Sequence, residues 1–199
     1  MALMNAKNRI MSSAMMLIVV FATPALAATW QADAAHSMLT FTNTYQNVEY
    51  TGQFRRFSAR IDYDPTDLAH AKFDVSVDIT SLDTQNAERD HAALGADFFD
   101  AAKFPRAHFV TTAVHKTADG KVVADGVLTL RGVSKPVMLE VVFMPHGNTA
   151  TLVVTARLKR LDFGIGTGQW ADPSLIGDGV TVRGHLVLTR ATTSKTARH

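Results

Sequence analysis

Apolar and polar residues alternate along much of this sequence, and no other feature constrains its fold as strongly. The alternation is clearest in residues 72–80, where every second residue from Phe73 to Ile79 is apolar and the residues between them are polar. A period of two puts successive side chains on opposite faces of a β-strand. Further segments fit strands in the same way, namely 37–45, 52–63, 107–116, 121–131, 137–144, 151–160 and 180–189. The sequence therefore predicts an all-β protein with eight strands.

Short connections rich in turn residues separate the later strands. Ala118-Asp119-Gly120 and Pro145-His146-Gly147-Asn148 are typical of hairpins, and Arg131-Gly132 begins a tight connection that continues to Pro136. Parallel neighbours need connections of about a dozen residues or more, so these turns indicate antiparallel strands. Because proline lacks the backbone N–H, we expect Pro136 at the beginning of its strand.

One long connection, between the third and fourth strands, breaks the alternation. Residues 84–103 are rich in helix formers, with Ala87, Asp90 and Leu94 at helical spacing, and Asp97 is a candidate N-cap for the residues after it. We expect a helix near 86–94 and a second short turn near 98–102.

Eight antiparallel strands with one apolar face would leave unpaired edges, and closing the sheet into a barrel removes them. With about eight strands, the interior is either filled by side chains or just large enough for one small ligand. The inward positions are apolar, so an enclosed ligand should be apolar too. We expect an eight-stranded antiparallel barrel like that of lipocalins, although a two-layer sandwich satisfies the same alternation.

The N-terminus has the composition of a secretory signal peptide. Lys7 and Arg9 precede a short apolar run at residues 10–22, Pro24 interrupts it, and Ala25-Leu26-Ala27 is a typical cleavage site. A transmembrane helix would need about 20 apolar residues, more than this run contains. We expect residues 1–27 to be removed, residues 28–190 to fold and residues 191–199 to form a polar tail. The protein is then predicted to be periplasmic.

Composition argues against several function classes. The chain has 20 Lys and Arg against 18 Asp and Glu, and loss of Lys7 and Arg9 brings the basic count to 18 as well. A chain near neutrality is a poor candidate for binding nucleic acid, which requires basic surfaces. The absence of cysteine excludes disulfides, thiolate zinc sites and thiol nucleophiles.

Motifs for metal binding and catalysis are missing as well. No two of the 8 histidines have the i, i+4 spacing of a helical zinc site, and no His-x-His pair occurs. The sequence has no Gly-x-Ser-x-Gly motif and no phosphate-binding loop followed by Lys-Ser or Lys-Thr. We therefore predict no metal, no cofactor and no catalytic residue.

The candidate ligand-binding residues are large apolar side chains on the face predicted to point inward, together with two phenylalanines on the helical connection. They are Phe41, Phe57, Ile61, Phe73, Val75, Val77, Phe98, Phe99, Leu128, Leu139 and Val154. The same residues would equally fill a dry core, and composition does not distinguish the two interpretations. Phe98 and Phe99 either plug one end of the barrel or form a lid over an entrance.

Two arginines are candidates for binding a polar head group. Arg89 lies beside Asp90 on the predicted helix, and Arg160 lies two residues before Asp162 at a strand end. A guanidinium binds pyrophosphate through two parallel hydrogen bonds. Pairing with a carboxylate or with the backbone is the simpler, structural role for each.

Short sequence motifs spread along the chain resemble those of a known family. They are Ala35-His36-Ser37, Gly52-Gln53-Phe54, Ile61-Asp62-Tyr63-Asp64-Pro65, Ser81-Leu82-Asp83-Thr84, Asp97-Phe98-Phe99-Asp100, residues 126–137 and residues 160–166. Their order and spacing resemble the YceI-like family of secreted lipid- or polyisoprenoid-binding proteins. The resemblance implies a lipocalin-like barrel with a hydrophobic pore for a long isoprenoid chain, in a protein that can form homodimers. Residues 43–47 and 166–173 depart from the family pattern, which leaves the identity of the ligand open.

We therefore predict a periplasmic carrier or sequestering protein for an isoprenoid lipid of polyprenyl or quinone type, with transient membrane contact. Two other classes stay open. An enzyme that uses the same pocket would need Asp90, His91 or His36 to converge as acid–base groups. A stress-related envelope protein would instead act through an exposed face or a dimer.

Overall fold

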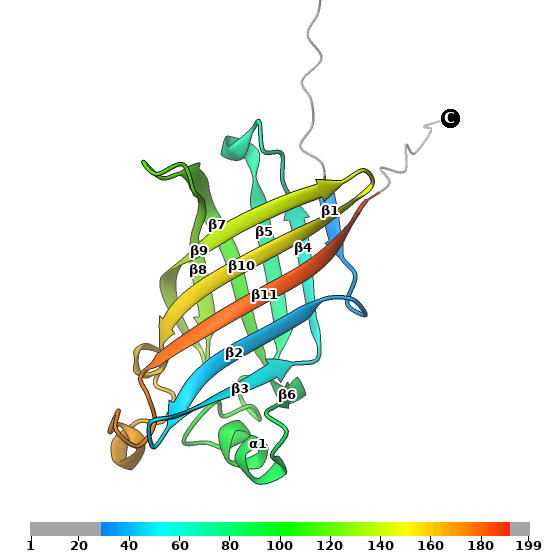
Figure 1. Cartoon of the computed structure of the whole chain (residues 1–199). Helices are drawn as coiled ribbons and strands as arrows, with labels where there is room; N and C mark the ends of the chain where they lie inside the picture. The colour runs from blue at the N-terminus through cyan, green and yellow to red at the C-terminus, as the bar shows by residue number, and fades with distance from the viewer. Residues whose placement is uncertain (1–28, 192–199) are drawn as a thin grey trace, which may run out of the picture.

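The computed structural model describes residues 29–191, which form a closed sheet with one short α-helix (Figure 1). The strands are β1 (Thr29–Ala32), β2 (Met38–Tyr45), β3 (Val48–Phe54), β4 (Phe57–Asp62), β5 (Lys72–Asp78), β6 (Leu82–Asp83), β7 (Arg106–Lys116), β8 (Val122–Leu130), β9 (Val133–His146), β10 (Thr149–Lys159) and β11 (Gly179–Arg190). The helix is α1 (Ala87–Leu94), and the 3-10 helices are η1 (Leu68–His70), η2 (Ile79–Ser81), η3 (Arg160–Phe163) and η4 (Gly168–Trp170). The predicted signal peptide and residues 192–199 of the predicted tail lie outside the described residues. No helix within residues 29–191 is long and apolar enough to cross a membrane.

The sheet closes because β1 pairs with a strand on each side. Trp30 lies opposite Ile61 of β4 on one side and opposite Arg190 of β11 on the other. The resulting ring runs β1-β4-β5-β7-β8-β9-β10-β11 and is antiparallel throughout. The predicted eight-stranded, lipocalin-like barrel is therefore confirmed, and the alternative of a two-layer sandwich is wrong.

The structure has three more strands than predicted. The predicted strand 52–63 is divided into β3 and β4, whereas β1, which closes the ring, and β6 lie outside the predicted segments. β1 and β2 lie one after the other along β11, separated by residues 33–37. β3 and β4 are separated by Arg55 and Arg56, and β5 and β6 are separated by η2. At η2, the Asp78 side chain accepts a hydrogen bond from the backbone N–H of Thr80, which caps the short helical turn.

The connection between β6 and β7 has the predicted helix. Asn86 is the N-cap of α1, because its side-chain oxygen accepts a 2.9 Å hydrogen bond from the backbone N–H of Arg89. Gly95 ends the helix, and turns follow it through Phe99 and again over residues 101–103. Asp100 between them has a φ of 47°, a left-handed conformation that a right-handed helix does not accommodate.

One strand prediction is wrong in position. Pro136 lies inside β9, opposite Val127 of β8, and does not begin the strand. The register explains how proline is tolerated there: the pairing of β9 with β10 extends only to Leu139 opposite Ala156. Pro136 therefore lies in a part of β9 that has no hydrogen-bonded neighbour on one side, the local equivalent of a sheet edge.

The interior of the barrel is packed near one end. We call the end that carries η1 the upper end and the end that carries α1 the lower end (Figure 1). Near the upper end the rings of Trp30 and Tyr63 pack against Phe143, with centroids 5.5 Å and 4.7 Å from it. The surrounding inner-face side chains have at most 1% of their surface exposed, namely Ile61, Phe73, Leu152 and Leu188. This half is therefore a packed core.

The inner face is different in the middle and lower parts of the barrel. Its apolar residues are only half-buried there, although they point to the same side as the packed residues; they are Leu39, Phe41, Phe54, Phe57, Val75, Val77, Leu128, Val137, Leu139, Val154, Leu158, Val180 and Val182. Side chains in a close-packed core lose nearly all of their exposed surface. Their partial exposure indicates that the lower half encloses space that the protein's own side chains do not fill.

Glycines on the inner face let large side chains lie flat against the wall. A Cβ atom placed on Gly52 would lie 2.6 Å from Cε1 of Phe41, and one placed on Gly126 would lie 2.6 Å from Cε2 of Phe109. Both rings therefore occupy the position in which another residue would carry its side chain. This arrangement keeps the two rings at the wall of the interior.

We expect Gly126→Ala to destabilise the barrel by about 1–3 kcal/mol, because the added methyl group overpacks the wall. It would also lie 2.5 Å from the carbonyl oxygen of Val110, which is part of the backbone and cannot rotate away. Urea unfolding measures the effect. Gly179→Ala on β11 is the control, because nothing lies within 4 Å of its Cβ position; equal losses in the two variants would contradict this explanation.

Candidate ligand site in the lower half of the barrel

The structure divides the predicted lining residues into three groups. Phe41, Phe57, Val75, Val77, Leu128, Leu139 and Val154 are half-buried on the inner face where the interior is not filled. Ile61 and Phe73 belong to the packed upper half, where each has 1% of its surface exposed. Phe98 and Phe99 lie on the connection at the lower end. The candidate site therefore consists of the first group.

Phe98 and Phe99 pack as part of the wall at the lower end. The ring centroid of Phe99 lies 6.2 Å from that of Phe54, and the ring of Phe98 lies 5.6 Å from that of Trp170. Both phenylalanines contact a second buried cluster that contains Ile79 and Phe163. Of the two interpretations of Phe98 and Phe99, these contacts favour the plug.

Arg160 holds the loops at the lower end and is not free to bind a ligand. Only 4% of it is exposed, and its guanidinium donates hydrogen bonds to five backbone carbonyls. The acceptors are the carbonyl oxygens of Ile165, Gly166, Trp170, Ile176 and Gly177. Burial lowers the pKa of this guanidinium, while the nearby Asp178 carboxylate opposes that shift. The geometry thus favours a structural role over the head-group role.

Arg131 has a similar role that the sequence analysis missed. It lies in the two-residue turn between β8 and β9 with a φ of 50°, and its Nη2 donates a 2.7 Å hydrogen bond to the carbonyl of Ala96. Its Nη1 donates to the carbonyl of Gly164. The turn therefore carries a cation that joins the connection after α1 to the loop after η3. In the sequence, the tight turn at Arg131-Gly132 is the feature that could have indicated this role.

Arg89 lies at the lower end of the interior, over an inward-facing tyrosine. Its guanidinium carbon is 4.6 Å from the ring centroid of Tyr50, within the range of a cation–π contact. Its Nε and Nη2 donate to the side chain and carbonyl of Thr84 at 2.8 Å and 2.7 Å. Burial raises the pKa of Tyr50, and the positive charges of Arg89 and Arg160 partly offset this. The structure therefore places Arg89 against Tyr50, and the charge of Arg160 also acts on this tyrosine.

The acid–base residues of the enzyme alternative do not converge. Asp90 accepts hydrogen bonds from the backbone and side chain of Thr84 at 2.9 Å and 2.6 Å. His91 is exposed on α1. The side chain of His36 is 72% exposed and pairs with Asp33 beside β11. Within residues 29–191, no cluster of three or more His, Asp or Glu is placed to hold a metal ion.

A closed antiparallel ring with an apolar, partly unfilled interior defines a lipocalin-like β-barrel. Within that class, this chain belongs to the YceI-like family, since the family model for the YceI-like domain matches residues 30–188. The family resemblance noted in the sequence is therefore confirmed, and it extends over almost all of the described residues.

Relatives support the same assignment. A UPF0312 protein of Vibrio vulnificus strain YJ016 is 35% identical over 177 residues, which cover 84% of this chain and 94% of that protein. Among solved structures, Burkholderia cenocepacia BcnA is 33% identical with a TM-score of 0.75, covering 81% of this chain and 99% of its own. A polyisoprenoid binding domain from Saccharophagus degradans has a TM-score of 0.63 over 84% of this chain and 100% of its own. It is 18% identical, so its similarity shows a shared fold.

We expect Arg160→Met to destabilise the protein by about 3 kcal/mol or more, because buried carbonyls lose their donors. Thermal or urea unfolding measures the loss. The control is Arg157→Met, which breaks the exposed ion pair of Arg157 with Glu140 and should cost less than about 1 kcal/mol. If both variants lost the same small amount, the structural role of Arg160 would be contradicted.

The raised pKa of Tyr50 predicts a loss of stability at high pH. Between the ordinary tyrosine pKa of about 10 and the higher folded-state pKa, the unfolded chain has lost the proton and the folded chain keeps it. The unfolded state then binds fewer protons, so the free energy of unfolding falls as pH rises. In Tyr50→Phe this decline should be shallower, as urea unfolding at several pH values above 9 would measure. An unchanged decline would contradict the burial of Tyr50.

Proposed function

We propose that this protein binds an isoprenoid lipid of polyprenyl or quinone type, with the apolar chain in the lower half of the barrel. The observation that carries the proposal is the row of half-buried apolar side chains on the inner face, among them Val75, Leu128 and Val154. These residues are apolar and remain partly accessible, whereas the upper half is packed. A guest chain would complete the burial that the protein leaves incomplete.

The hydrophobic effect is large enough for such binding. Transfer of one CH₂ group from water to an apolar environment contributes about 0.8 kcal/mol, so each five-carbon isoprene unit contributes about 3–4 kcal/mol before the chain is ordered. Loss of translational, rotational and chain freedom offsets about 4–15 kcal/mol. Several units are therefore needed for micromolar binding, which favours a long isoprenoid over a short one.

Arg89 is the better of the two arginines to contact a polar head group. Two of its guanidinium nitrogens donate to Thr84 while the group remains half-buried over Tyr50. Arg160 already donates to five carbonyls. A head group at the lower end would thus find the cation of Arg89 and the hydroxyl of Tyr50.

Similar proteins also support the proposal of lipid binding. The solved structure from Saccharophagus degradans is described as a polyisoprenoid binding domain, and the fold it shares with this chain is the barrel that encloses the candidate site. The predicted signal peptide supports a periplasmic carrier or sequestering role that needs no turnover. A homodimer and transient membrane contact stay predictions of the family resemblance.

Organic extraction of purified protein, followed by mass spectrometry, tests the proposal. The protein should be produced from its complete sequence and purified without detergent. We expect an isoprenoid lipid in the extract, or saturable uptake of added farnesol or a longer isoprenol by protein that is empty. Lipid-free protein that also fails to bind these isoprenols would contradict the proposal.

We expect Leu139→Trp to weaken isoprenol binding by about tenfold or more, a loss of about 1.4 kcal/mol. Leu139 lies opposite Ala124 and Ala156, so a larger ring there can extend into the interior. Fluorescence titration measures the affinity. Val142→Trp is the matched control on the same strand, because Val142 faces outward with 55% of its surface exposed. Equal affinities of the two variants would contradict the location of the site.

A further inference from the structure

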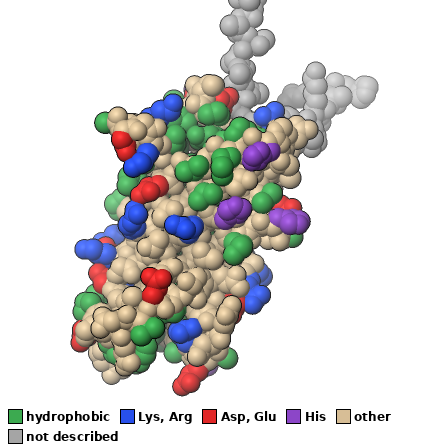
Figure 2. Space-filling view, viewed as in Figure 1, with side chains coloured by type: hydrophobic (Ala, Val, Ile, Leu, Met, Phe, Trp, Pro, Cys, Tyr) green, Lys and Arg blue, Asp and Glu red, His purple; other side chains and the backbone are tan. Residues whose placement is uncertain are grey.

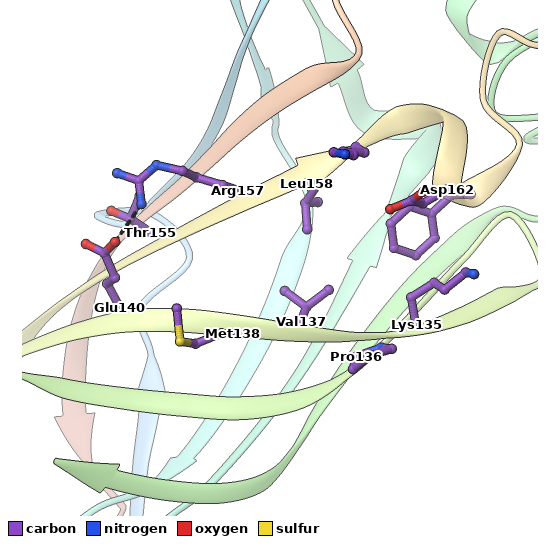
Figure 3. Close-up of a pocket in the computed structure, with 11 residues that line it drawn as sticks. Lys135, Pro136, Val137, Met138, Glu140, Thr155, Arg157, Leu158 and Asp162 are labelled. Atoms are coloured by element: carbon purple, nitrogen blue, oxygen red, sulfur yellow. Dashed lines mark hydrogen bonds and ion pairs between the residues drawn. The ribbon is translucent and has the colours of Figure 1, made fainter. Parts of the chain in front are cut away.

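The wall of the barrel is split between β9 and β10 towards the lower end. Their paired residues run from His146 opposite Thr149 to Leu139 opposite Ala156 and stop there. Residues 133–138 of β9 remain paired with β8, and residues 157–159 of β10 remain paired with β11. Each strand thus continues in the sheet on one side while losing its neighbour on the other. Figure 3 shows the two strands diverging around Val137 and Leu158.

The split is encoded in the sequence by Pro136, which weakens the pairing of β9 with β10. The two-residue turn of Arg131 and Gly132 joins Leu130 to Val133, and in such a turn the later residue donates back to the earlier one. Val133 therefore directs its backbone groups towards β8, and so do the odd-numbered residues that follow it along β9. The even-numbered residues, Pro136 included, face β10. Proline has no N–H to donate, so it weakens pairing across the split.

The split opens into a pocket with a volume of about 360 Å³. Its lining comes from both faces of the wall. Val137 and Leu158 point inward and are half-buried, and Val137 packs against both buried clusters of the interior. Met138 and Arg157 point outward and are exposed. The pocket thus reaches from outer-face side chains to inner-face side chains of the same two strands, and the buried Phe163 of η3 also lines it.

Exposed apolar side chains flank the outer side of this pocket. Met138 is 50% exposed on β9 and Val127 is 40% exposed on β8. Farther along β9, Val142 and Met144 are 55% and 40% exposed. Figure 2 shows several hydrophobic side chains on the upper part of the face that β9, β10 and β11 present, with Lys, Arg and His side chains among them. Apolar side chains that cluster on a protein surface mark a site where an apolar partner can bind.

We propose that the split between β9 and β10 is a lateral portal through which the apolar chain of the lipid enters and leaves the barrel. This inference rests on the proposed function. Among residues 29–191, side chains pack together at both ends of the barrel: Trp30 and Tyr63 contact Phe143 at the upper end. At the lower end, Phe98 packs against Trp170, and Arg160 fixes the loop behind them. The side wall is where inner and outer apolar surfaces meet.

Reversible closure of the split tests the portal. The chain has no cysteine, so Met138→Cys with Arg157→Cys places a single thiol pair across the split, at the next position in register after Leu139 and Ala156. A thiol-cleavable bis-maleimide joins the pair. The probe is farnesol carrying a dansyl group, and stopped-flow fluorescence measures its entry and release. We expect closure to slow both rates by about tenfold or more with nearly unchanged affinity, and cleavage of the linker to restore them.

The control closes the same two strands where they are already paired. Val142→Cys with Val153→Cys joins directly opposed, outward-facing residues, and crosslinking it should leave both rates unchanged. Protein crosslinked at the split after loading should retain the probe, and protein crosslinked before loading should take it up slowly. If crosslinking at the split leaves the rates of a binding-competent protein unchanged, the portal is wrong and lipid binding stands. If the uncrosslinked wild-type protein binds no isoprenol, the proposed function fails and the portal with it.

Discussion

Hydrogen bonding of β1 to strands on both sides is the constraint on which the rest of the structure depends. β1 has only 4 residues, yet its pairing with β4 and β11 closes the ring. An open sheet would expose unpaired N–H and C=O groups at its edges and would need a second layer to cover its apolar face. The closed ring turns every second side chain towards one interior. Trp30 of β1 also packs into that interior and lies under the guanidinium of Arg190.

Closure alone does not make a binding site, because a barrel of this size can be filled completely. In this chain the upper half is filled by aromatic and branched side chains, and the lower half is left incomplete. At the lower end, the guanidinium groups of Arg131 and Arg160 donate hydrogen bonds to the carbonyl oxygens of loop residues. These hydrogen bonds hold the loops at the lower end in place. Under the proposed function, Arg89 is then the candidate for contact with the head group. The split beside Pro136 then becomes the opening that connects the apolar interior to the outside.

The sequence predicts the barrel because a period of two is a direct consequence of strand geometry, and it predicts α1 because helix formers act locally. It does not predict β1, because a strand of 4 residues is too short to show the alternation. It could not distinguish Phe73 from Val75: both face inward two residues apart, and only the packing of distant strands makes one fully buried and the other half-buried. A structural role for Arg160 with backbone partners was one of its two interpretations, but its acceptors were not predictable, since Trp170 and Ile176 lie in a loop without a repeating pattern. Pro136 indicates correctly that this part of the strand is not paired on both sides, but the sequence does not reveal that β9 passes through Pro136 and leaves it without a neighbour on the β10 side.

The most direct test of a guest in the lower half is an NMR measurement of contacts between added isoprenol and the ¹³C-labelled methyl groups of valine and leucine. The account predicts intermolecular nuclear Overhauser effects to Val75, Val77, Leu128, Leu139 and Val154, and none to Leu152, Leu186 and Leu188 of the packed half. Contacts confined to the outward-facing Val127 and Val142, or an absence of contacts at saturating isoprenol, would contradict it.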